Sequence, residues 1–353
     1  MAAMLSVGYS LAQMEPIDAE YRNVCGMDFI PTYQDITTRL SLPSSPSFND
    51  TASSAAAWAA YNLNGSSPER TGIENQLARI QDAGFNTVRV WLSFHYYSFH
   101  PIDMQNKLKD FLDLCYARDL HVIPVIWDAD FFEPSSGSLE GGPNYENYNK
   151  WIRSPGNEVI IAQEGGLDPD MHGQFVLNML SAATSGPIQH WLPPTNSNYP
   201  YRTLLLWDVM NEPIFDLENP HQYTWIVNTL NLIKQVNSDI GTAVTPKYWE
   251  NAPLHYNLAA NENLDVLAFN FYAYGIRDIE GKCDNALHML LDQGLDPKPI
   301  LVMEAGLLGA GQQYAEVVNL LTKVPATYTG SATGDGVGFC LFSANVGEQA
   351  WPA

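Results

Sequence analysis

The chain has few positive charges and no long apolar run, and each shortage excludes a class of partner. Its 353 residues include 17 Lys and Arg against 39 Asp and Glu, a formal net charge of −22 at pH 7. Such a chain repels nucleic acid and anionic membrane surfaces, so we expect neither as a partner. No apolar stretch approaches the roughly 20 residues that cross a bilayer. The charge is compatible with a neutral substrate.

The chain also lacks clustered cysteines. Cys25, Cys115, Cys283 and Cys340 are widely separated and form no CxxC or Cys/His pattern with the spacing of a zinc site. We expect free, buried thiols, because packing as a small apolar residue is the commoner role of an isolated cysteine. The sequence predicts no metal and no cofactor.

A complete signal peptide is missing as well. Residues 1–23 are interpreted as an N-terminal extension in which residues 2–12 are mildly apolar and Ser10-Leu11-Ala12 resembles a signal-peptidase site. The basic region that precedes the apolar core of a signal peptide is absent. We expect at most a truncated signal peptide here, and the interpretation that the sequence favours is an ordinary N-terminal segment packed on the barrel. The segment favours a secreted or periplasmic location, with a cytoplasmic location as the alternative.

The most informative stretch is Leu204–Pro213, LLLWDVMNEP, in which an apolar run is followed by Asn211 and Glu212. A short apolar run of this kind is typical of a strand buried on both faces. Proline cannot donate a ladder hydrogen bond, so Pro213 should end the strand. A second run, Pro299–Gly306, carries Glu304 in the same position. Two glutamates at the ends of buried strands predict a pair of carboxylates that act together, although either alone could form a structural ion pair.

Strand-like runs alternate with helical patterns along the whole chain. We interpret eight runs as strands: 24–30, 86–92, 120–127, 202–209, 241–245, 265–272, 299–304 and 336–342. This alternation predicts an α/β fold with a parallel sheet closed into a single-domain (β/α)8 TIM barrel over residues 1–353. Catalytic groups of such barrels lie at the carboxyl ends of the strands.

Long connections should cover that end of the barrel. We expect loops at Ser41–Ser67 and Glu133–Gly156, and an aromatic loop at Ser93–Phe99. Only eleven residues follow Phe342, too few for a usual eighth helix, so we expect either that the N-terminal segment covers this part of the barrel or that the final helix is missing or replaced.

Several polar residues lie near the predicted strand ends. Arg89 stands in the apolar run NTVRVWL, where a buried guanidinium needs a carboxylate partner. We expect Arg89 beside a catalytic glutamate, with a structural ion pair as the alternative. Asp128 and Asp130 follow the third strand, and we expect them to bind sugar hydroxyls or fix a loop rather than hold a metal. His95 belongs to the aromatic loop.

In these residues the chain resembles the clan A glycoside hydrolases, and most closely family 5 and the related endo-β-mannanase-like proteins. The resemblance rests on Asn211-Glu212-Pro213 after the fourth strand together with Glu304 in the seventh. It implies a retaining β-glycoside hydrolase in which Glu212 is the general acid/base and Glu304 the nucleophile. The two carboxyl groups should then lie about 5–5.5 Å apart.

The resemblance also implies roles for neighbouring residues. Asn211 would hydrogen-bond the substrate 2-hydroxyl, Arg89 would hold the nucleophile ionised, and Tyr272 would hydrogen-bond Glu304. Trp91 and Trp249 would stack on sugar rings. The remaining residues that we expect to bind substrate, or to be further aromatic contacts, are Asn270, Asp128, His95, Tyr96, Tyr97, Trp127 and Tyr248.

The sequence departs from the family pattern at two positions. Asn270-Phe271-Tyr272 replaces the usual His-x-Tyr of strand six, and Phe342 replaces a tryptophan at strand eight, a place that Trp351 is the candidate to fill. These changes affect the expected sugar preference more than the reaction type.

The resemblance alone suggests the substrate, a β-linked oligo- or polysaccharide cleaved by a monomer. β-1,4-Mannan is the first expectation and β-1,4-glucan, for an endoglucanase, the second. A catalytically inactive carbohydrate-binding barrel, a Schiff-base aldolase using Lys247 and a metal-dependent hydrolase are the alternatives.

Overall fold

Eight parallel strands form a closed barrel. The computed structural model describes residues 21–29, 31, 54–128, 154–185, 190, 202–215, 217–218, 220–250, 252–273, 276–307, 314–330 and 335–341. Within them the strands pair in chain order and β8 pairs with β1, which confirms the predicted (β/α)8 barrel. The strands are β1 Cys25–Phe29, β2 Thr87–Trp91, β3 His121–Asp128, β4 Trp207–Asn211, β5 Thr242–Thr245, β6 Val266–Ala273, β7 Ile300–Leu307 and β8 Gly338–Leu341.

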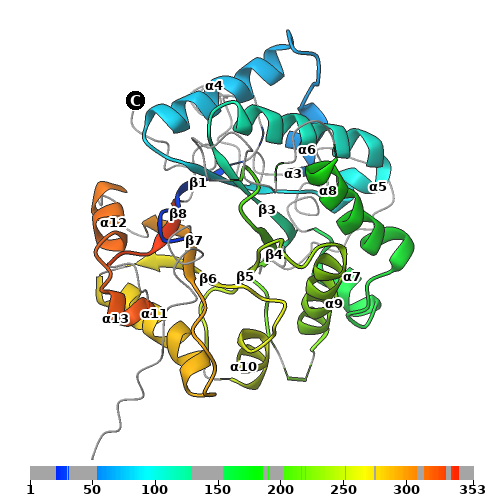
Figure 1. The fold of residues 1–353 in the computed structure, drawn as a ribbon. Coiled ribbons are helices and arrows are strands. Elements are labelled where there is room, and N and C mark those ends of the chain that lie inside the picture. The colour runs from blue at the N-terminus through cyan, green and yellow to red at the C-terminus, as the bar shows by residue number, and fades with distance from the viewer. Residues whose placement is uncertain are drawn as a thin grey trace, which may run out of the picture.

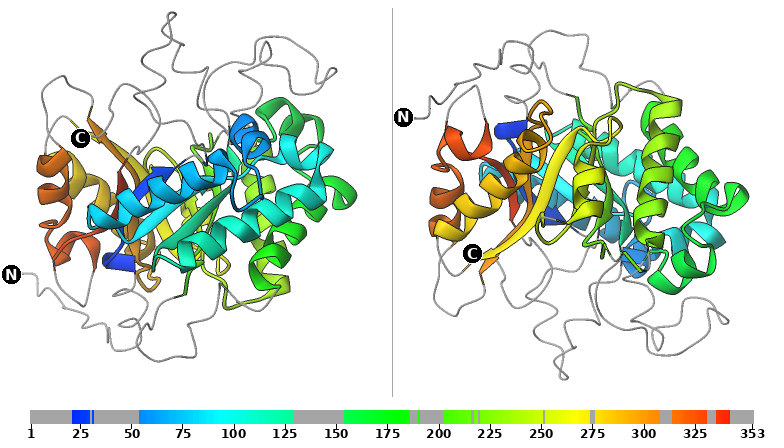
Figure 2. Two further views of the ribbon diagram at one scale, coloured as in Figure 1. Left: turned by 90° about the horizontal axis from the view of Figure 1, so that it is seen from above. Right: turned by 90° about the horizontal axis from the view of Figure 1, so that it is seen from below.

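Helices surround the ring of strands. Figure 1 looks along the barrel and shows α4 and α6 on one side of the ring and α11 and α12 on another, and the turned views of Figure 2 also place helices outside the strands. The helices are α3 Ser54–Ala60, α4 Pro68–Asp82, α5 Phe94–Phe99, α6 Pro101–Tyr116, α7 Asn157–Ala162, the π-helix η4 Pro169–Gly173, α8 Gln174–Thr184, α9 His221–Val236, α10 Pro253–Ala259, α11 Ile276–Leu291, α12 Tyr314–Leu321 and α13 Ala326–Thr329.

Two segments predicted as loops contain helices. The predicted loop at 41–67 includes α3, whose alanines favour helix and whose buried Trp58 donates its indole N–H to the carbonyl of Trp91 at 2.8 Å. The predicted aromatic loop at 93–99 is helix α5, because the Ser93 hydroxyl caps it by accepting the N–H of Tyr96 at 3.1 Å. Residues 32–53 and 129–153 lie outside the described part, and so does Asp130.

The strand boundaries also differ from the predicted ones. β4 begins at Trp207 rather than at residue 202, because Leu204 forms only an isolated bridge with Val122. β7 continues beyond Glu304 to Leu307. Glu304 therefore lies within a paired strand rather than at its last position.

The apolar core has an outer and an inner part. The larger cluster fills the space between strands and helices, and a smaller one includes Ile123, Leu205 and Cys340 of the barrel interior. Tyr21 packs with this inner cluster. A Cβ at Gly338 would lie 1.9 Å from the Tyr21 carbonyl oxygen, so only glycine allows this close approach. The segment before β1 thus packs on the amino-terminal end of the barrel.

The four cysteines are free thiols, and three of them are buried as predicted. Cys25 is half-buried, so the prediction was wrong for this residue. Cys340 pairs in register with Gly26, the residue after Cys25, so Cys25 faces the opposite side of the sheet.

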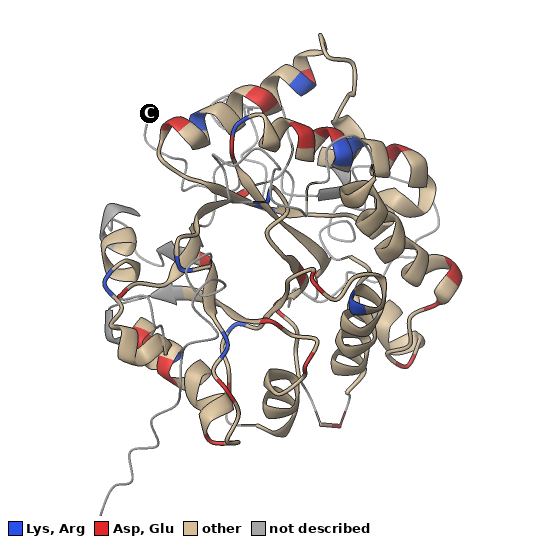
Figure 3. Cartoon of the chain, viewed as in Figure 1, with Lys and Arg blue, Asp and Glu red and all other residues tan. Residues whose placement is uncertain are grey.

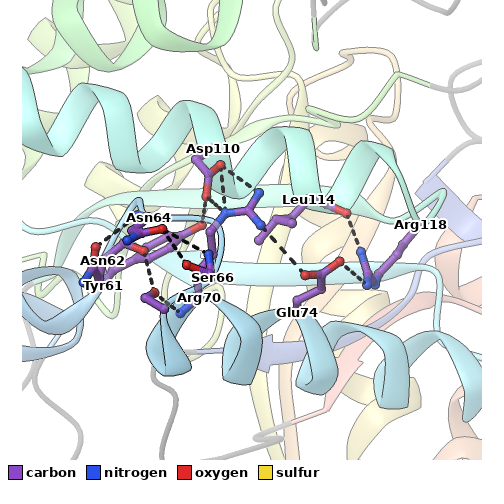
Figure 4. Close-up of polar contacts among 10 residues, drawn as sticks. Tyr61, Asn62, Asn64, Ser66, Arg70, Glu74, Asp110, Leu114 and Arg118 are labelled. Carbon is purple, nitrogen blue, oxygen red and sulfur yellow. Dashed lines mark hydrogen bonds and ion pairs between the residues drawn. The ribbon is translucent and has the colours of Figure 1, made fainter.

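Ion pairs join the outer helices. Figure 4 shows Arg70 of α4 donating from Nε and Nη2 to Asp110 of α6, at 2.9 and 3.0 Å, while the hydroxyl of Tyr61 donates to the same carboxylate. Glu74 accepts from Arg118 at 3.0 Å further along the two helices. These contacts hold α4 against α6.

Figure 3 marks the charged residues along the helices and the connections, and Asp and Glu are more frequent than Lys and Arg, in keeping with the net charge of −22. None of the helices that the structure describes is long and apolar enough to cross a membrane.

Candidate active site

The backbone of Glu212 adopts an unusual conformation directly after β4. Its φ is 45°, in the left-handed region that residues other than glycine seldom adopt. The turn is fixed on both sides, because the Glu212 N–H donates to the carbonyl of Thr245 at 2.8 Å and the Ile214 N–H donates to Oε1 of Gln222 at 2.7 Å. Backbone strain of this kind is concentrated at functional sites.

Glu212 is 8% exposed, and each of its carboxylate oxygens has a polar partner. Oε1 accepts a hydrogen bond from Nδ2 of Asn270 at 3.0 Å, and Oε2 pairs with Nζ of Lys247 at 3.2 Å. Burial and the charge of Glu304 raise the pKa of Glu212, and the two donors offset only part of that rise. Of the paired glutamates, Glu212 is thus in surroundings that favour its protonated form.

Glu304 has different surroundings. It is 4% exposed, and its Oε1 accepts a hydrogen bond from Nη1 of Arg89 at 2.9 Å. The register of the sheet places Glu304 beside Asn270, which contacts Glu212. A guanidinium–carboxylate contact of this length is a charge-assisted hydrogen bond.

Arg89 is fully buried and contacts three carboxylates. Its Nε and Nη2 donate to Oδ2 of Asp208 at 3.1 and 2.7 Å, and Nη2 also donates to Oδ1 of Asn211 at 2.8 Å. Nη1 lies 3.5 Å from Oδ1 of Asp28. The predicted contact between Arg89 and a site glutamate is present, and the predicted structural ion pair exists beside it.

Asp28 was missed by sequence reasoning. It is fully buried in β1, and its Oδ2 has no hydrogen-bond partner among the described residues. One guanidinium cannot neutralise three buried carboxylates, and an uncompensated buried charge is costly. Burial accordingly raises the pKa of Asp28 well above its ordinary range, and Arg89 offsets only part of this. An acidic residue inside the apolar strand CGMDF was the available signal.

Three further predicted residues lie around this centre. Asn211 accepts at Oδ1 from Arg89 and also from Asn270, the latter at 3.3 Å. Trp91 ends β2 and is half-buried, with the guanidinium carbon of Arg89 4.6 Å from its ring centroid. Asp128 ends β3 beside Asn211 in register and is 5% exposed.

The prediction that Trp249 stacks on sugar disagrees with its position. Trp249 is 2% exposed, and its indole N–H donates to the carbonyl of Ala268 at 2.9 Å, so the core encloses its ring. Trp127 is fully buried and donates to Thr229. Both tryptophans are core residues rather than stacking surfaces.

The other aromatic candidates divide by exposure. Tyr96, Tyr97 and His95 of α5 are 6–7% exposed, whereas Tyr248 is 47% exposed directly after Lys247. Tyr272 lies in β6 and pairs in register with Gly306, and its side chain lies outside the described part. Phe342 and Trp351 lie outside it too.

Among the residues that the structure describes, no group of three or more His, Cys, Asp or Glu is arranged to hold a metal ion. Lys247, the residue of the aldolase alternative, is an ion-pair partner of Glu212.

Comparisons with known proteins agree with this architecture. The family model for cellulase, glycosyl hydrolase family 5, matches residues 49–333. A comparison with curated protein sequences gives no match. The exo-β-1,4-mannosidase Op5Man5 from Opitutaceae bacterium strain TAV5 is similar in structure, with a TM-score of 0.51 and 16% identity over 81% of this chain and 49% of that chain. The endo-β-1,4-mannanase from Thermotoga petrophila gives a TM-score of 0.50 and 11% identity over 93% and 69%. At these identities the likeness is one of fold.

Proposed function

The chain belongs to glycosyl hydrolase family 5 and is a glycoside hydrolase, and from this premise we propose that it cleaves β-linked saccharides with retention of configuration. Glu212 is the proposed general acid/base and Glu304 the proposed nucleophile. The observation that carries the proposal is the difference between their surroundings. Glu212 is buried with a raised pKa, whereas Glu304 contacts the guanidinium of Arg89 at 2.9 Å.

The two steps of the reaction use this difference. In the first, a carboxylate oxygen of Glu304 attacks the anomeric carbon while Glu212 gives its proton to the departing glycosidic oxygen. In the second, Glu212 takes a proton from water, the water oxygen attacks the anomeric carbon, and Glu304 leaves as a carboxylate. A carboxyl separation of about 5–5.5 Å belongs to this mechanism and remains part of the proposal.

The neighbours of the two glutamates have supporting roles in the proposal. Oδ1 of Asn211 already accepts from Arg89 and Asn270, so its Nδ2 is the atom that can donate to the 2-hydroxyl of the sugar. Trp91 offers a half-buried ring beside Arg89, and Asp128 offers a carboxylate at the end of β3.

β-1,4-Mannan is the substrate that we propose to test first, because the resemblance favours it and the two similar structures are named for β-1,4-mannan chemistry. β-1,4-Glucan is the second candidate, since the matching family model is named for cellulase. The residues themselves do not separate an axial from an equatorial 2-hydroxyl.

The test is the release of reducing ends from β-mannan, β-glucan, xylan and aryl β-glycosides, with a folded Glu304→Ala variant as the blank. We expect release from one substrate class that vanishes in the variant, and proton NMR should show the β-anomer as the first product. An inverted first product would refute the retaining mechanism. Sugar binding without any release would instead support the inactive carbohydrate-binding barrel.

A further inference from the structure

The two residues that contact the carboxylate of Glu212 are joined through their backbones by a third residue. Asn270 donates from Nδ2 to Oε1 of Glu212 at 3.0 Å, and Nζ of Lys247 contacts Oε2 at 3.2 Å. The main-chain carbonyl oxygens of Asn270 and Lys247 both accept from Nζ of Lys282, at 3.1 and 3.3 Å. One ammonium group of the outer helix α11 therefore bridges the two residues that hold the proposed general acid.

The strand ladder supplies little of this connection. β5 pairs in register with β6 as far as Val244. Pro246 follows two residues later, and although its carbonyl accepts from the Asn270 N–H at 3.2 Å, it has no N–H to donate in return. The register of β6 with β7 shifts between Phe269 and Asn270, and such an irregularity interrupts the ladder and redirects side chains. Lys282 supplies donors where the ladder is interrupted.

The ammonium group of Lys282 is itself held in place. Its Nζ lies 5.6 Å from the ring centroid of Tyr248 and 5.7 Å from that of Phe271, in addition to the two carbonyl contacts. Burial lowers the pKa of Lys282, and the charges of Asp278 in the same helix and of Glu212 offset part of this. Because burying an ammonium group is costly unless its donors are satisfied, these contacts restrict where Nζ can lie.

We propose that Lys282 is a positioning residue for the general acid, which holds Asn270 and Lys247 where they orient the carboxyl group of Glu212 toward the departing glycosidic oxygen. This inference rests on the proposed function and adds a residue to it. Lys282 acts through the two residues that it holds rather than on the substrate. Proton transfer depends on the placement of the donor, so loss of Lys282 should slow bond cleavage most where the leaving group needs a proton.

The test compares the phenyl and the 2,4-dinitrophenyl glycoside of the sugar that the wild-type enzyme cleaves best. Dinitrophenolate is a stable anion that leaves without a proton, whereas phenolate needs one. In Lys282→Met we expect kcat/KM to fall about tenfold on the phenyl glycoside, part of the roughly 10²–10⁴-fold that general acid–base catalysis contributes, and less than about twofold on the dinitrophenyl glycoside. Lys282→Arg, which keeps the charge and the donors, should recover most of the loss.

Lys298 offers a matched control at the opposite end of the barrel. Its Nζ also bridges two main-chain carbonyls, those of Ala259 and Asn261, at 2.7 and 2.8 Å, but it lies before β7 rather than near the carboxyl ends of the strands. Lys298→Met should leave the ratio of the two kcat/KM values unchanged. The same change of ratio in Lys298→Met as in Lys282→Met would overturn the inference, because it would reflect a general loosening of the barrel.

Glu212→Ala separates failure of the inference from failure of the proposed function. It should lose far more activity on the phenyl than on the dinitrophenyl glycoside. If it does, and Lys282→Met loses activity equally on both or not at all, the inference is overturned and the proposed function stands. If Glu212→Ala does not discriminate between the two glycosides, both are overturned. Lys282→Gln, with the same ratio as its readout, replaces Lys282→Met if circular dichroism shows that the latter does not fold.

Discussion

Asp28→Asn keeps the shape of a buried side chain and removes its ability to ionise. Asp28 shares Arg89 with Asp208 and Glu304 and has the longest contact, 3.5 Å against 2.7 and 2.9 Å. Burial raises the pKa of Asp28 well above its ordinary range. The native protein therefore retains a proton on Asp28 at pH values where the unfolded chain has released it. The sign follows: this residue makes the native state less stable as pH rises above about 3.9.

The magnitude follows from the linkage between protons and folding. Each pH unit between the unfolded and the native pKa of Asp28 lowers the free energy of unfolding by about 1.4 kcal/mol. Asparagine does not titrate, and the other groups are common to both proteins. The free energy of unfolding of Asp28→Asn minus that of the wild type should therefore increase by about 1.4 kcal/mol per pH unit from about pH 5 upward, until the pH reaches the native pKa of Asp28.

Urea unfolding followed by tryptophan fluorescence measures this difference, since the chain has nine Trp. Asp28→Ala is the matched control, because it also removes the charge but leaves a cavity. Its difference from the wild type should have the same pH slope and a lower absolute stability. A slope of zero for Asp28→Asn would refute the reasoning, since it would mean that Asp28 is ionised in the native state and paired with Arg89.

Three further substitutions test other parts of the structure. Arg89→Met leaves buried carboxylates without their cation and should cost about 3–5 kcal/mol of stability. We expect circular dichroism to show a folded barrel and turnover to be greatly lowered. Near-normal turnover would contradict the role of Arg89 beside Glu304. His172 is 2% exposed, and burial lowers its pKa. The native state therefore resists protonation of His172 and loses stability as pH falls below about 6.5. Between about pH 7 and about pH 5, the melting temperature of His172→Phe should fall less than that of the wild type. Trp249→Phe removes the hydrogen bond to Ala268 and should lower stability by about 1–3 kcal/mol with little change in KM. A raised KM at an unchanged melting temperature would instead support a sugar-stacking role for Trp249.

The barrel could be predicted because its signals are local. Each strand is a short apolar run, each helix has its own periodicity, and their alternation in the chain determines a parallel closed sheet. The contact of Arg89 with Glu304 could be predicted for a similar reason, because a charged side chain buried in an apolar strand needs an opposite charge beside it.

The rest of the site depends on contacts between distant strands. The argument that applies to Arg89 applies to Asp28, but only the register of β1 with β2 places the two side by side. Trp249 illustrates the opposite error. A tryptophan near a strand end has the same local sequence whether its ring faces a ligand or the core, and here the carbonyl of Ala268 and the ring of His255 enclose it.

Asn270 determines which groups can control the pH dependence of this site. It stands where the family pattern has a histidine, and its amide contacts both Asn211 and Glu212. An amide supplies the same kind of hydrogen bond as an imidazole N–H, but it does not change charge near neutral pH. The titration of Glu212 is therefore not coupled to an imidazole at this position. Among the described residues, burial and the charge of Glu304 raise the pKa of Glu212, whereas Asn270 and the ammonium of Lys247 lower it, and Lys282 is a further cation nearby. The position of the basic limb therefore reports the balance between burial, one carboxylate and the lysines beside it.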